Sequence, residues 1–330
     1  MRGKTWMYGA IITAGLACQG GGAAWAADDT AYPSRPVRML IGQAPGGAVD
    51  TLARMTAEAL GSRLGQPVVV ESRPGAGGML AAGTLARAEP DGHTLGFLDV
   101  GAIAVAPLLQ KSVPYDPDRD FTFLGTAARI PLVMVAHPSL DASTPAELTR
   151  DSQARPDTLN YASAGVGSPP HMAFEAYKYA AQAPIRHIAY RGGAPALADV
   201  VAGHVQLTFI DTNLGSQYVR DGRVKAIGVA TRNRSPLLPD VPTFAESGIT
   251  DFDFAPWVGV VGPAGLPVAV VDRVSSALAE VVADPAFVER VQALGFEPFP
   301  GDARTFAALA SRERDEYRTL IQEQRITLEE

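Results

Sequence analysis

Three glycine-rich segments in this chain stand between an apolar run and a segment with helical periodicity. Their sequences are Pro45-Gly46-Gly47-Ala48-Val49-Asp50, Ala164-Gly165-Val166-Gly167-Ser168 and Arg191-Gly192-Gly193-Ala194. Glycine lets the backbone approach a ligand closely, and the first turn of a helix has unpaired N–H groups at the positive end of its dipole. Several such turns facing one cleft would bind an anion, most naturally a carboxylate. For a single Gly-Gly pair, a tight turn without a ligand is the alternative.

The segments around these turns alternate between strand and helix patterns. The apolar run at 37–41 predicts a strand, and apolar residues at helical spacing from Val49 to Leu64 predict a helix that ends at Gly65. Further strands are expected at 68–71, 94–98, 160–163, 185–190, 205–210 and 224–230. This alternation predicts an α/β fold with mainly parallel sheets, in which ligands bind outside the carboxyl ends of the strands.

Two apolar stretches are expected to cross between two halves of the molecule. Residues 121–137 predict a strand pair that enters the second half, and 252–261 returns to the first, with Trp257 as a core residue of the crossing. Thr144 is expected to cap a helix that has Glu147 at its third position. Three amphipathic helices are expected to finish the chain.

Composition sets the size and class of the protein. With 330 residues, 47% of them hydrophobic and 19% charged, the chain is long enough for two α/β lobes with cores of their own. The formal net charge of −7, without basic runs, argues against nucleic acid as a partner. The composition therefore predicts an ordinary soluble protein, neither disordered nor embedded in a membrane.

Residues 1–26 have the features of a cleaved export signal. Arg2 and Lys4 precede an apolar run at 6–17, and Ala24-Trp25-Ala26 fits a cleavage motif. The run is too short for a permanent membrane anchor, so we expect a mature periplasmic chain that starts near Ala27.

The single cysteine, Cys18, lies inside this signal, and cleavage after residue 26 would leave no disulfide and no thiolate chemistry. The segment Gly15-Leu16-Ala17-Cys18 loosely resembles a lipoprotein cleavage box, which usually has leucine where Gly15 stands. Lipidation of Cys18 and the cleavage position stay open.

Motifs of enzymes are absent from the sequence. It contains no nucleophile elbow, phosphate-binding lysine loop, paired zinc histidines or CxxC, and Gly75-x-Gly77 lacks the third glycine of a dinucleotide fingerprint because Leu80 stands there. Ser163 and Ser168 near His171 suggest a Ser/His pair, but no acid can be placed to orient it. We therefore expect no enzymatic activity, no cofactor and no metal.

Short motifs in a fixed order resemble the Bug family of periplasmic receptors of tripartite tricarboxylate transporters. They cover nearly the whole chain after residue 31, and they are Tyr32-Pro33-x-Arg35-Pro36, Ala44-Pro45-Gly46-Gly47, Gly65-Gln66-Pro67-Val68-Val69-Val70-Glu71, Arg73-Pro74-Gly75-Ala76-Gly77-Gly78, Pro90-Asp91-Gly92, Pro114-Tyr115-Asp116-Pro117, Asn160-Tyr161-Ala162-Ser163-Ala164-Gly165, Ser235-Pro236-x-Leu238-Pro239-Asp240-Val241-Pro242-Thr243 and Pro263-Ala264-Gly265. Each motif is weak alone, and the ordered set is specific.

This resemblance implies a type II periplasmic binding fold, with one lobe from 27–128 and 251–330 and the other from 129–250. It implies a carboxylate clamp made of Pro45, Gly46, Gly47, Ala48, Asp50, Ser163, Ala164, Gly165, Val166, Gly167 and Ser168. It assigns the far side of the cleft to Val100, Gly101, Ala102, Tyr190, Arg191, Gly192 and Asp211.

Several of these residues have two interpretations. His171, which the family often shares, contacts the ligand or packs at its helix start, and Arg191 contacts the ligand or stays at the surface. Asp50 touches the solute or caps its helix, and Asp211 faces the cleft or closes a turn. The remaining histidines are expected to be surface or satisfied residues: His93, His137, His187 and His204.

The chain departs from the family pattern by losing hydroxyl groups. Ala48 and Val49 replace the usual Ser-Thr, Val166 replaces an Asn, and Asp99-Val100-Gly101-Ala102 replaces a Thr-Ser-Gly-Thr turn. Backbone donors survive these changes, so one carboxylate still binds, and the rest of the ligand should be more apolar than malate or citrate, such as an aromatic carboxylate. An Asp99 that faces the cleft would disfavour a second carboxylate or attract an ammonium group.

The expected function is capture of a small organic carboxylate by a monomeric periplasmic receptor that presents it to the membrane subunits of a tripartite tricarboxylate-type transporter. The alternative is a sensory receptor that uses the same clamp to signal to a membrane histidine kinase.

Overall fold

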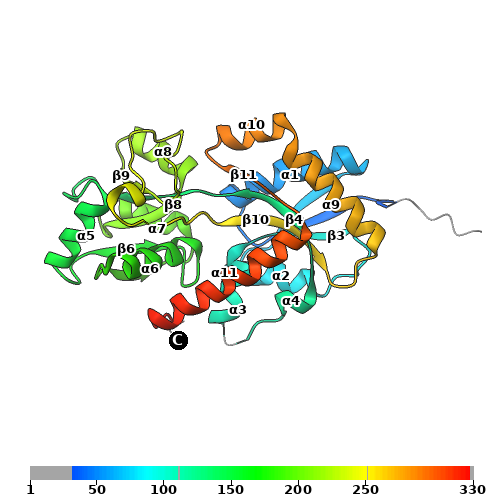
Figure 1. Ribbon diagram of the computed structural model, residues 1–330, viewed down its shortest axis with the longest axis horizontal. Helices are drawn as coiled ribbons and strands as arrows, with labels where there is room; N and C mark the ends of the chain where they lie inside the picture. Colours follow the sequence, from blue (N-terminus) through cyan, green and yellow to red (C-terminus); the bar gives the residue numbers. More distant parts are fainter. Residues whose placement is uncertain (1–31, 111, 251, 328–330) are drawn as a thin grey trace, which may run out of the picture. The chain divides into compact units, whose positions relative to one another are not determined.

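The computed structural model describes residues 32–110, 112–250 and 252–327, which form two sheets covered by helices (Figure 1). The predicted export signal and Cys18 lie outside the described residues. The six strands of the larger sheet are β1 (Val37–Ile41), β2 (Val68–Ser72), β3 (Thr94–Asp99), β4 (Phe121–Arg129), β10 (Trp257–Pro263) and β11 (Glu297–Gly301). The five strands of the smaller sheet are β5 (Leu132–Ala136), β6 (Asn160–Ser163), β7 (Arg186–Ala189), β8 (Leu207–Asp211) and β9 (Lys225–Val229).

The helices alternate with these strands along most of the chain. They are α1 (Ala48–Leu64), η1 (Ala76–Gly78), α2 (Met79–Leu85), η2 (Gly101–Val105), α3 (Ala106–Leu109), α4 (Pro117–Asp120), α5 (Pro145–Ala154), α6 (Pro169–Ala181), α7 (Gly193–Val201), α8 (Thr212–Arg220), η3 (Ala245–Ser247), α9 (Val268–Ala283), α10 (Pro285–Ala293) and α11 (Ala303–Glu323). The predicted helix after the first glycine turn is confirmed, since α1 ends at Gly65 in the left-handed conformation. The predicted cap is also present, because the Thr144 hydroxyl accepts the Glu147 N–H at 3.2 Å.

Both sheets are mixed, so the prediction of mainly parallel sheets was wrong. The larger sheet has the order β11-β4-β10-β3-β1-β2, and only the β1–β2 and β1–β3 pairs are parallel. The smaller sheet has the order β7-β6-β8-β5-β9, with β5 antiparallel to both its neighbours. The reason is that β4, β5 and β10 adjoin the two chain crossings, and they enter the sheets without the helical crossover that makes neighbouring strands parallel.

Strand β11 was missed by the sequence reading. Its sequence, Glu297-Pro298-Phe299-Pro300-Gly301, contains two prolines, which cannot donate to a ladder and argue against a strand. The strand forms because it lies at the edge of the sheet, where it pairs only with β4. Helices α9, α10 and α11 confirm the three predicted amphipathic helices, with β11 between the last two.

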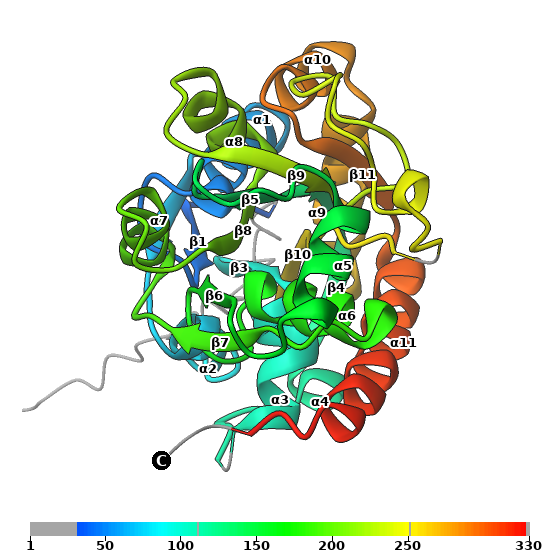
Figure 2. The ribbon, with the colours of Figure 1, turned by 90° about the vertical axis from the view of Figure 1, so that its left-hand side faces the viewer.

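Each sheet lies between two layers of helices. In the smaller sheet, α5 and α6 pack on one face through Leu148, Phe174 and Tyr177, while α7 and α8 pack on the other (Figure 2). In the larger sheet, α1, α9 and α10 cover one face, and α2, η2 and α11 cover the other. The chain passes between the sheets at 130–131 and again at 230–256, as the green and yellow connections show (Figure 1).

Candidate functional site

The predicted site residues lie at junctions where a strand of the described chain is followed, after a short segment, by a helix. Strands β1, β3, β6, β7 and β8 are followed by α1, η2, α6, α7 and α8 respectively. The turns between them contain glycines with positive φ, at +88° for Gly46, +120° for Gly165 and +79° for Gly167. Such angles strain any residue with a Cβ, so the sequence places glycine where the backbone folds back from strand to helix.

The first turn offers backbone donors from the start of α1. Its first intrahelical donor is Thr51, whose N–H bonds the Gly47 carbonyl at 3.0 Å, so the N–H groups from Gly47 to Asp50 lie at the positive end of the helix. Residues 44–47 are exposed, and Ala48 is half-buried. The predicted residues Pro45, Gly46, Gly47 and Ala48 therefore surround an accessible helix N-terminus.

Asp50 closes this turn from beneath. Its Oδ2 accepts the Gly46 N–H at 3.0 Å and the Arg54 Nε–H at 3.0 Å, and Arg54 also forms an ion pair with Oδ1 at 2.8 Å. The side chain is only 7% exposed. The hydrogen bond from Arg54 lowers the pKa of the carboxyl, followed by the bond from Gly46. These contacts favour the interpretation in which Asp50 holds the turn, and they occupy the Gly46 N–H.

The turn after β3 is buried. Val100 and Ala102 are each 1% exposed, and the Asp99 carboxylate accepts the Ala102 N–H at 3.1 Å and the Gln43 side-chain amide at 2.5 Å. Burial raises the pKa of Asp99 to about 6, although the bonds from Ala102 and Gly101 oppose this. Asp99 thus links this turn to the loop after β1.

The turn after β6 has most of its N–H groups bonded within the protein. Ser163 Oγ accepts the Gly165 N–H at 3.1 Å, His171 Nδ1 accepts the Gly167 N–H at 3.2 Å, and the Ser168 N–H bonds the Gly165 carbonyl at 3.1 Å. Pro169 and Pro170 have no N–H to offer. Among the described residues, the Val166 N–H and the buried Ser168 hydroxyl have no protein partner.

Two histidines pack beneath this turn, and one of them was missed. His187 was expected to be a surface or satisfied residue. Its Nε2 lies 2.7 Å from Ser163 Oγ, and its ring centroid lies 4.2 Å from that of His171. The serine–histidine pair in this region is therefore Ser163 with His187, while His171 bonds Gly167. The parallel pairing of β6 with β7 brings His187 there, and sequence separation hid the contact.

Burial keeps both rings neutral. It lowers the pKa of His171 to about 4, with a smaller effect from Lys178, and lowers that of His187 to about 3, with a further effect from His171. Tyr161 stacks on His187, and its hydroxyl donates to Glu175 at 2.5 Å. Glu175 in turn pairs with Lys178 at 2.8 Å.

The remaining predicted residues flank the same turn or cap a helix. The Tyr190 N–H bonds the Ser163 carbonyl at 3.0 Å, and the Tyr190 hydroxyl donates to Asp199 at 2.6 Å. Arg191 is exposed and Gly192 half-buried. Asp211 caps α8, because its Oδ1 accepts the Leu214 N–H at 2.9 Å, and burial raises its pKa. These bonds favour the interpretation of Asp211 as a turn residue.

The turn after β6 also touches the segment after β3. A Cβ at Gly167 would lie 2.8 Å from Leu109 and 3.5 Å from Val105, and Met172 packs in the same core cluster as Val100 and Ala102. Turns of the two sheets are therefore neighbours. The predicted site residues fall into two groups, 45–50 with 99–102 and 163–171 with 190–192, joined by this contact.

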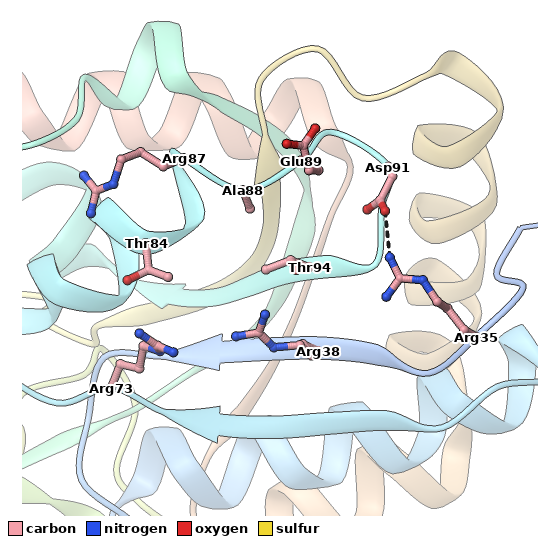
Figure 3. A pocket seen from close by; sticks show the side chains of 9 residues that line it. All are labelled: Arg35, Arg38, Arg73, Thr84, Arg87, Ala88, Glu89, Asp91 and Thr94. Carbon is pink, nitrogen blue, oxygen red and sulfur yellow. Dashed lines mark hydrogen bonds and ion pairs between the residues drawn. The ribbon is translucent and has the colours of Figure 1, made fainter.

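The cavities found on the protein lie away from these turns. One of about 540 Å³ is lined by Arg35, Arg38, Arg73, Arg87 and neighbouring residues (Figure 3). Its arginines are largely neutralised, since Glu71 pairs with Arg38 at 2.8 Å and with Arg73 at 2.7 Å, and Asp91 pairs with Arg35 at 2.9 Å. A larger cavity of about 810 Å³ lies between 231–236 and 289–298. No predicted site residue lines either cavity.

The described ranges also bear on metal binding and on membrane insertion. Residues 32–327, apart from 111 and 251, contain no cluster of three or more histidine, cysteine, aspartate or glutamate side chains suited to a metal ion. Within the same ranges, none of the helices combines the length and apolar character needed to span a bilayer.

The fold, two mixed α/β sheets with glycine turns at strand ends, is that of periplasmic binding proteins, because solved structures of this class are similar to the chain. The periplasmic binding protein BugD is 32% identical with a TM-score of 0.80, over 90% of this chain and 99% of BugD. Rpa4515 of R. palustris, solved with adipate, is 28% identical with a TM-score of 0.83, over 90% and 99%. MatC of Rhodopseudomonas palustris, solved with malate, is 30% identical with a TM-score of 0.78, over 88% and 100%.

A family model described as the tripartite tricarboxylate transporter family receptor matches residues 52–326. The chain belongs to this family, which confirms the resemblance drawn from its motifs. Members of the family are substrate-binding receptors, so the chain is a binding protein and not an enzyme.

Proposed function

We propose that this chain is a periplasmic receptor that binds one carboxylate group of a small organic acid between the turns of its two sheets and presents it to the membrane subunits of a tripartite tricarboxylate-type transporter. Two lobes, 27–128 with 251–330 and 129–250, would close on the ligand. The observation that carries the proposal is that α1 and α6 each begin after a glycine turn, and that the turn before α6 contacts the segment after β3, whose Asp99 is bonded to the loop before α1.

The donors that remain after internal hydrogen bonding define the clamp. Ala48 and Val49 contribute N–H groups from the first turn of α1, and the second turn contributes the Val166 N–H and the Ser168 hydroxyl. Hydrogen bonds to a charged oxygen contribute about 1.5–3 kcal/mol each. Two or three of them, with the helix dipole, suffice to hold one carboxylate. Support also comes from adipate and malate, which occupy Rpa4515 and MatC.

The rest of the ligand is proposed to be apolar, and an aromatic acid is the expected example. Ala48, Val49 and Val166 supply no side-chain hydrogen bonds near the clamp. The buried Asp99 carboxylate in the adjoining turn adds negative charge whenever it is ionised, which disfavours a second carboxylate there. We therefore expect benzoate-like acids to bind better than malate or citrate.

The test is a thermal-shift and calorimetric screen of the chain against benzoate, adipate, malate and citrate. A ligand present at about 100 times its Kd should add about 2.7 kcal/mol to the free energy of unfolding. Ser168→Ala should weaken binding of the best acid about ten- to hundredfold by removing one clamp donor. Ser62→Ala, an exposed change on α1, should leave the affinity unchanged.

The outcomes separate the parts of the proposal. Binding of benzoate above malate supports both the clamp and the apolar pocket, whereas binding of malate or citrate alone overturns the apolar pocket. If none of the four acids binds, the carboxylate clamp itself is contradicted. Reconstitution with the membrane subunits tests transport: uptake that is independent of this chain would contradict its role as their receptor.

A further inference from the structure

His171 occupies the third position of helix α6, where capping residues usually carry a different side chain. In a capping box a Glu or Gln at this position reaches back to a backbone N–H before the helix. Here the His171 Nδ1 reaches back to the Gly167 N–H at 3.2 Å. The acceptor is therefore an imidazole nitrogen, which can accept only when that nitrogen is unprotonated.

His187 holds the other end of the same turn. Its Nε2 lies 2.7 Å from Ser163 Oγ, which accepts the Gly165 N–H at 3.1 Å. The two rings are in contact, with centroids 4.2 Å apart, and both sit in an aromatic stack with Tyr161. His171 is 3% exposed and Ser163 is fully buried. Each glycine of the turn is thus fixed by one histidine, directly or through one serine.

We propose that His171 and His187 are positioning residues that hold the Gly165–Gly167 turn with uncharged rings, and that the absence of negative charge at this point lets the turn receive an anion. This inference rests on the proposed function. A glutamate at position 171 would fix the turn equally well, but it would place a carboxylate beneath a carboxylate clamp. A neutral ring gives the same geometry without that repulsion.

The charged residues near the two histidines also keep negative charge away from the turn. Glu175 and Lys178 on α6 pair with each other at 2.8 Å, and Tyr161 on β6 directs its hydroxyl to Glu175 rather than to the turn. Burial and Lys178 lower the pKa of His171 to about 4. The Nδ1 of His171 therefore stays unprotonated and can accept a hydrogen bond at neutral pH. The ion pair with Lys178 offsets the negative charge of Glu175 near the turn.

Three substitutions of one residue test the inference. His171→Gln keeps a neutral acceptor, His171→Glu keeps an acceptor but adds charge, and His171→Leu removes the acceptor. Hydrogen exchange of the Gly167 amide reports the turn without any ligand, and calorimetry with benzoate and adipate reports anion binding. Tyr179→Phe, an exposed change on the same helix, is the control for both measurements.

At pH 8 we expect Gln to keep both amide protection and affinity. The His171→Glu variant should keep the amide protection but lose more than tenfold in affinity. The His171→Leu variant should lose about tenfold in both protection and affinity, because about tenfold corresponds to the loss of one hydrogen bond. A Leu variant with unchanged protection of Gly167 would overturn the positioning role whatever the ligand. A Glu variant that binds as tightly as Gln would overturn the charge argument.

An NMR titration of the wild-type chain supplies the second readout. The His171 pKa should lie below 5, with the proton on Nε2, and protection of Gly167 should fall as the ring is protonated. A His171 pKa near 6.5 would contradict the inference. Intact protection together with no binding of benzoate or adipate would leave the turn as described and count against the proposed function alone.

Discussion

At the scale of single residues, Asp50 shows how an internal carboxylate fixes a glycine turn of the proposed anion site. Its bonds to the Gly46 N–H and to Arg54 fix the loop that leads into α1. We expect Asp50→Ala to lower the free energy of unfolding by about 1.5–3 kcal/mol, because a buried carboxylate with charged and backbone partners is lost. Urea denaturation at pH 7 measures this.

The effect should shrink in acid. Arg54 lowers the folded-state pKa of Asp50, so its contribution is present above the unfolded pKa and is lost as the pH falls through the folded value. Glu58→Ala, an exposed change on the same helix, should shift stability by less than about 0.5 kcal/mol. An Asp50→Ala variant as stable as Glu58→Ala would show that the loop holds its shape without the carboxylate.

His171 and His187 give a second residue-scale prediction, of acid sensitivity. Their folded pKa values of about 4 and about 3 lie below the unfolded value, so the unfolded chain binds more protons between these values and 6.5. Stability therefore falls as the pH is lowered from 6.5, by about 1.4 kcal/mol per pH unit for each ring. Urea titrations from pH 7 to 5 should show a shallower slope for the His171→Gln, His187→Gln double variant, and an unchanged slope would contradict the assignment.

At the scale of elements, a half-buried carboxyl of helix α11 contacts the start of β10, beside the aromatic contact of Phe306 with Trp257. Glu313 accepts the Trp257 indole N–H at 2.8 Å at the start of β10, and burial raises the Glu313 pKa to about 7, with a further effect from Glu316. Because the pKa of Glu313 is higher in the folded chain than in the unfolded chain, its contribution to stability is fully present below the unfolded-state pKa. That contribution is lost as the pH rises through 7.

Glu313→Gln should therefore stabilise the chain at pH 8 by about 1–3 kcal/mol, because the amide keeps the acceptor for Trp257 and never ionises. Near pH 4.5 the variant and the wild type should unfold at the same urea concentration. Glu323→Gln, an exposed change on the same helix, serves as the control. Destabilisation of Glu313→Gln at pH 8 would show that the ionised form is the one the fold prefers.

Some helices and strands could be predicted from the sequence, and others could not. Helix α1 and strands β1 to β3 could be predicted because periodicity and glycine positions are local signals. The antiparallel pairing of β10 between β3 and β4, and the edge strand β11, could not, since they depend on partners more than 100 residues away. The same limit explains His187: only the pairing of β7 with β6 reveals that it supports Ser163.

At the scale of the whole molecule, the proposed closure of two lobes requires that ligand binds the closed form more tightly than the open one. In the part of the chain that the structure describes, the connections between the sheets are 130–131 and the segment from 230 to 256, so motion would concentrate there. We expect small-angle X-ray scattering to show a smaller radius of gyration when benzoate or adipate saturates the protein. An unchanged radius with full occupancy would contradict closure, and Ser168→Ala at the same ligand concentration should show a smaller change.

The strand order of the larger sheet has a consequence for how the protein is made. Strand β10 lies between β3 and β4, yet it is synthesised after the whole of the smaller sheet. During synthesis, the strand that lies between β3 and β4 is missing until residue 263 of β10 has been made. Strands β5 to β9 are all present once residue 229 has been made. The smaller sheet can thus fold first, and the larger sheet stays unfinished until β10 and β11 have been synthesised.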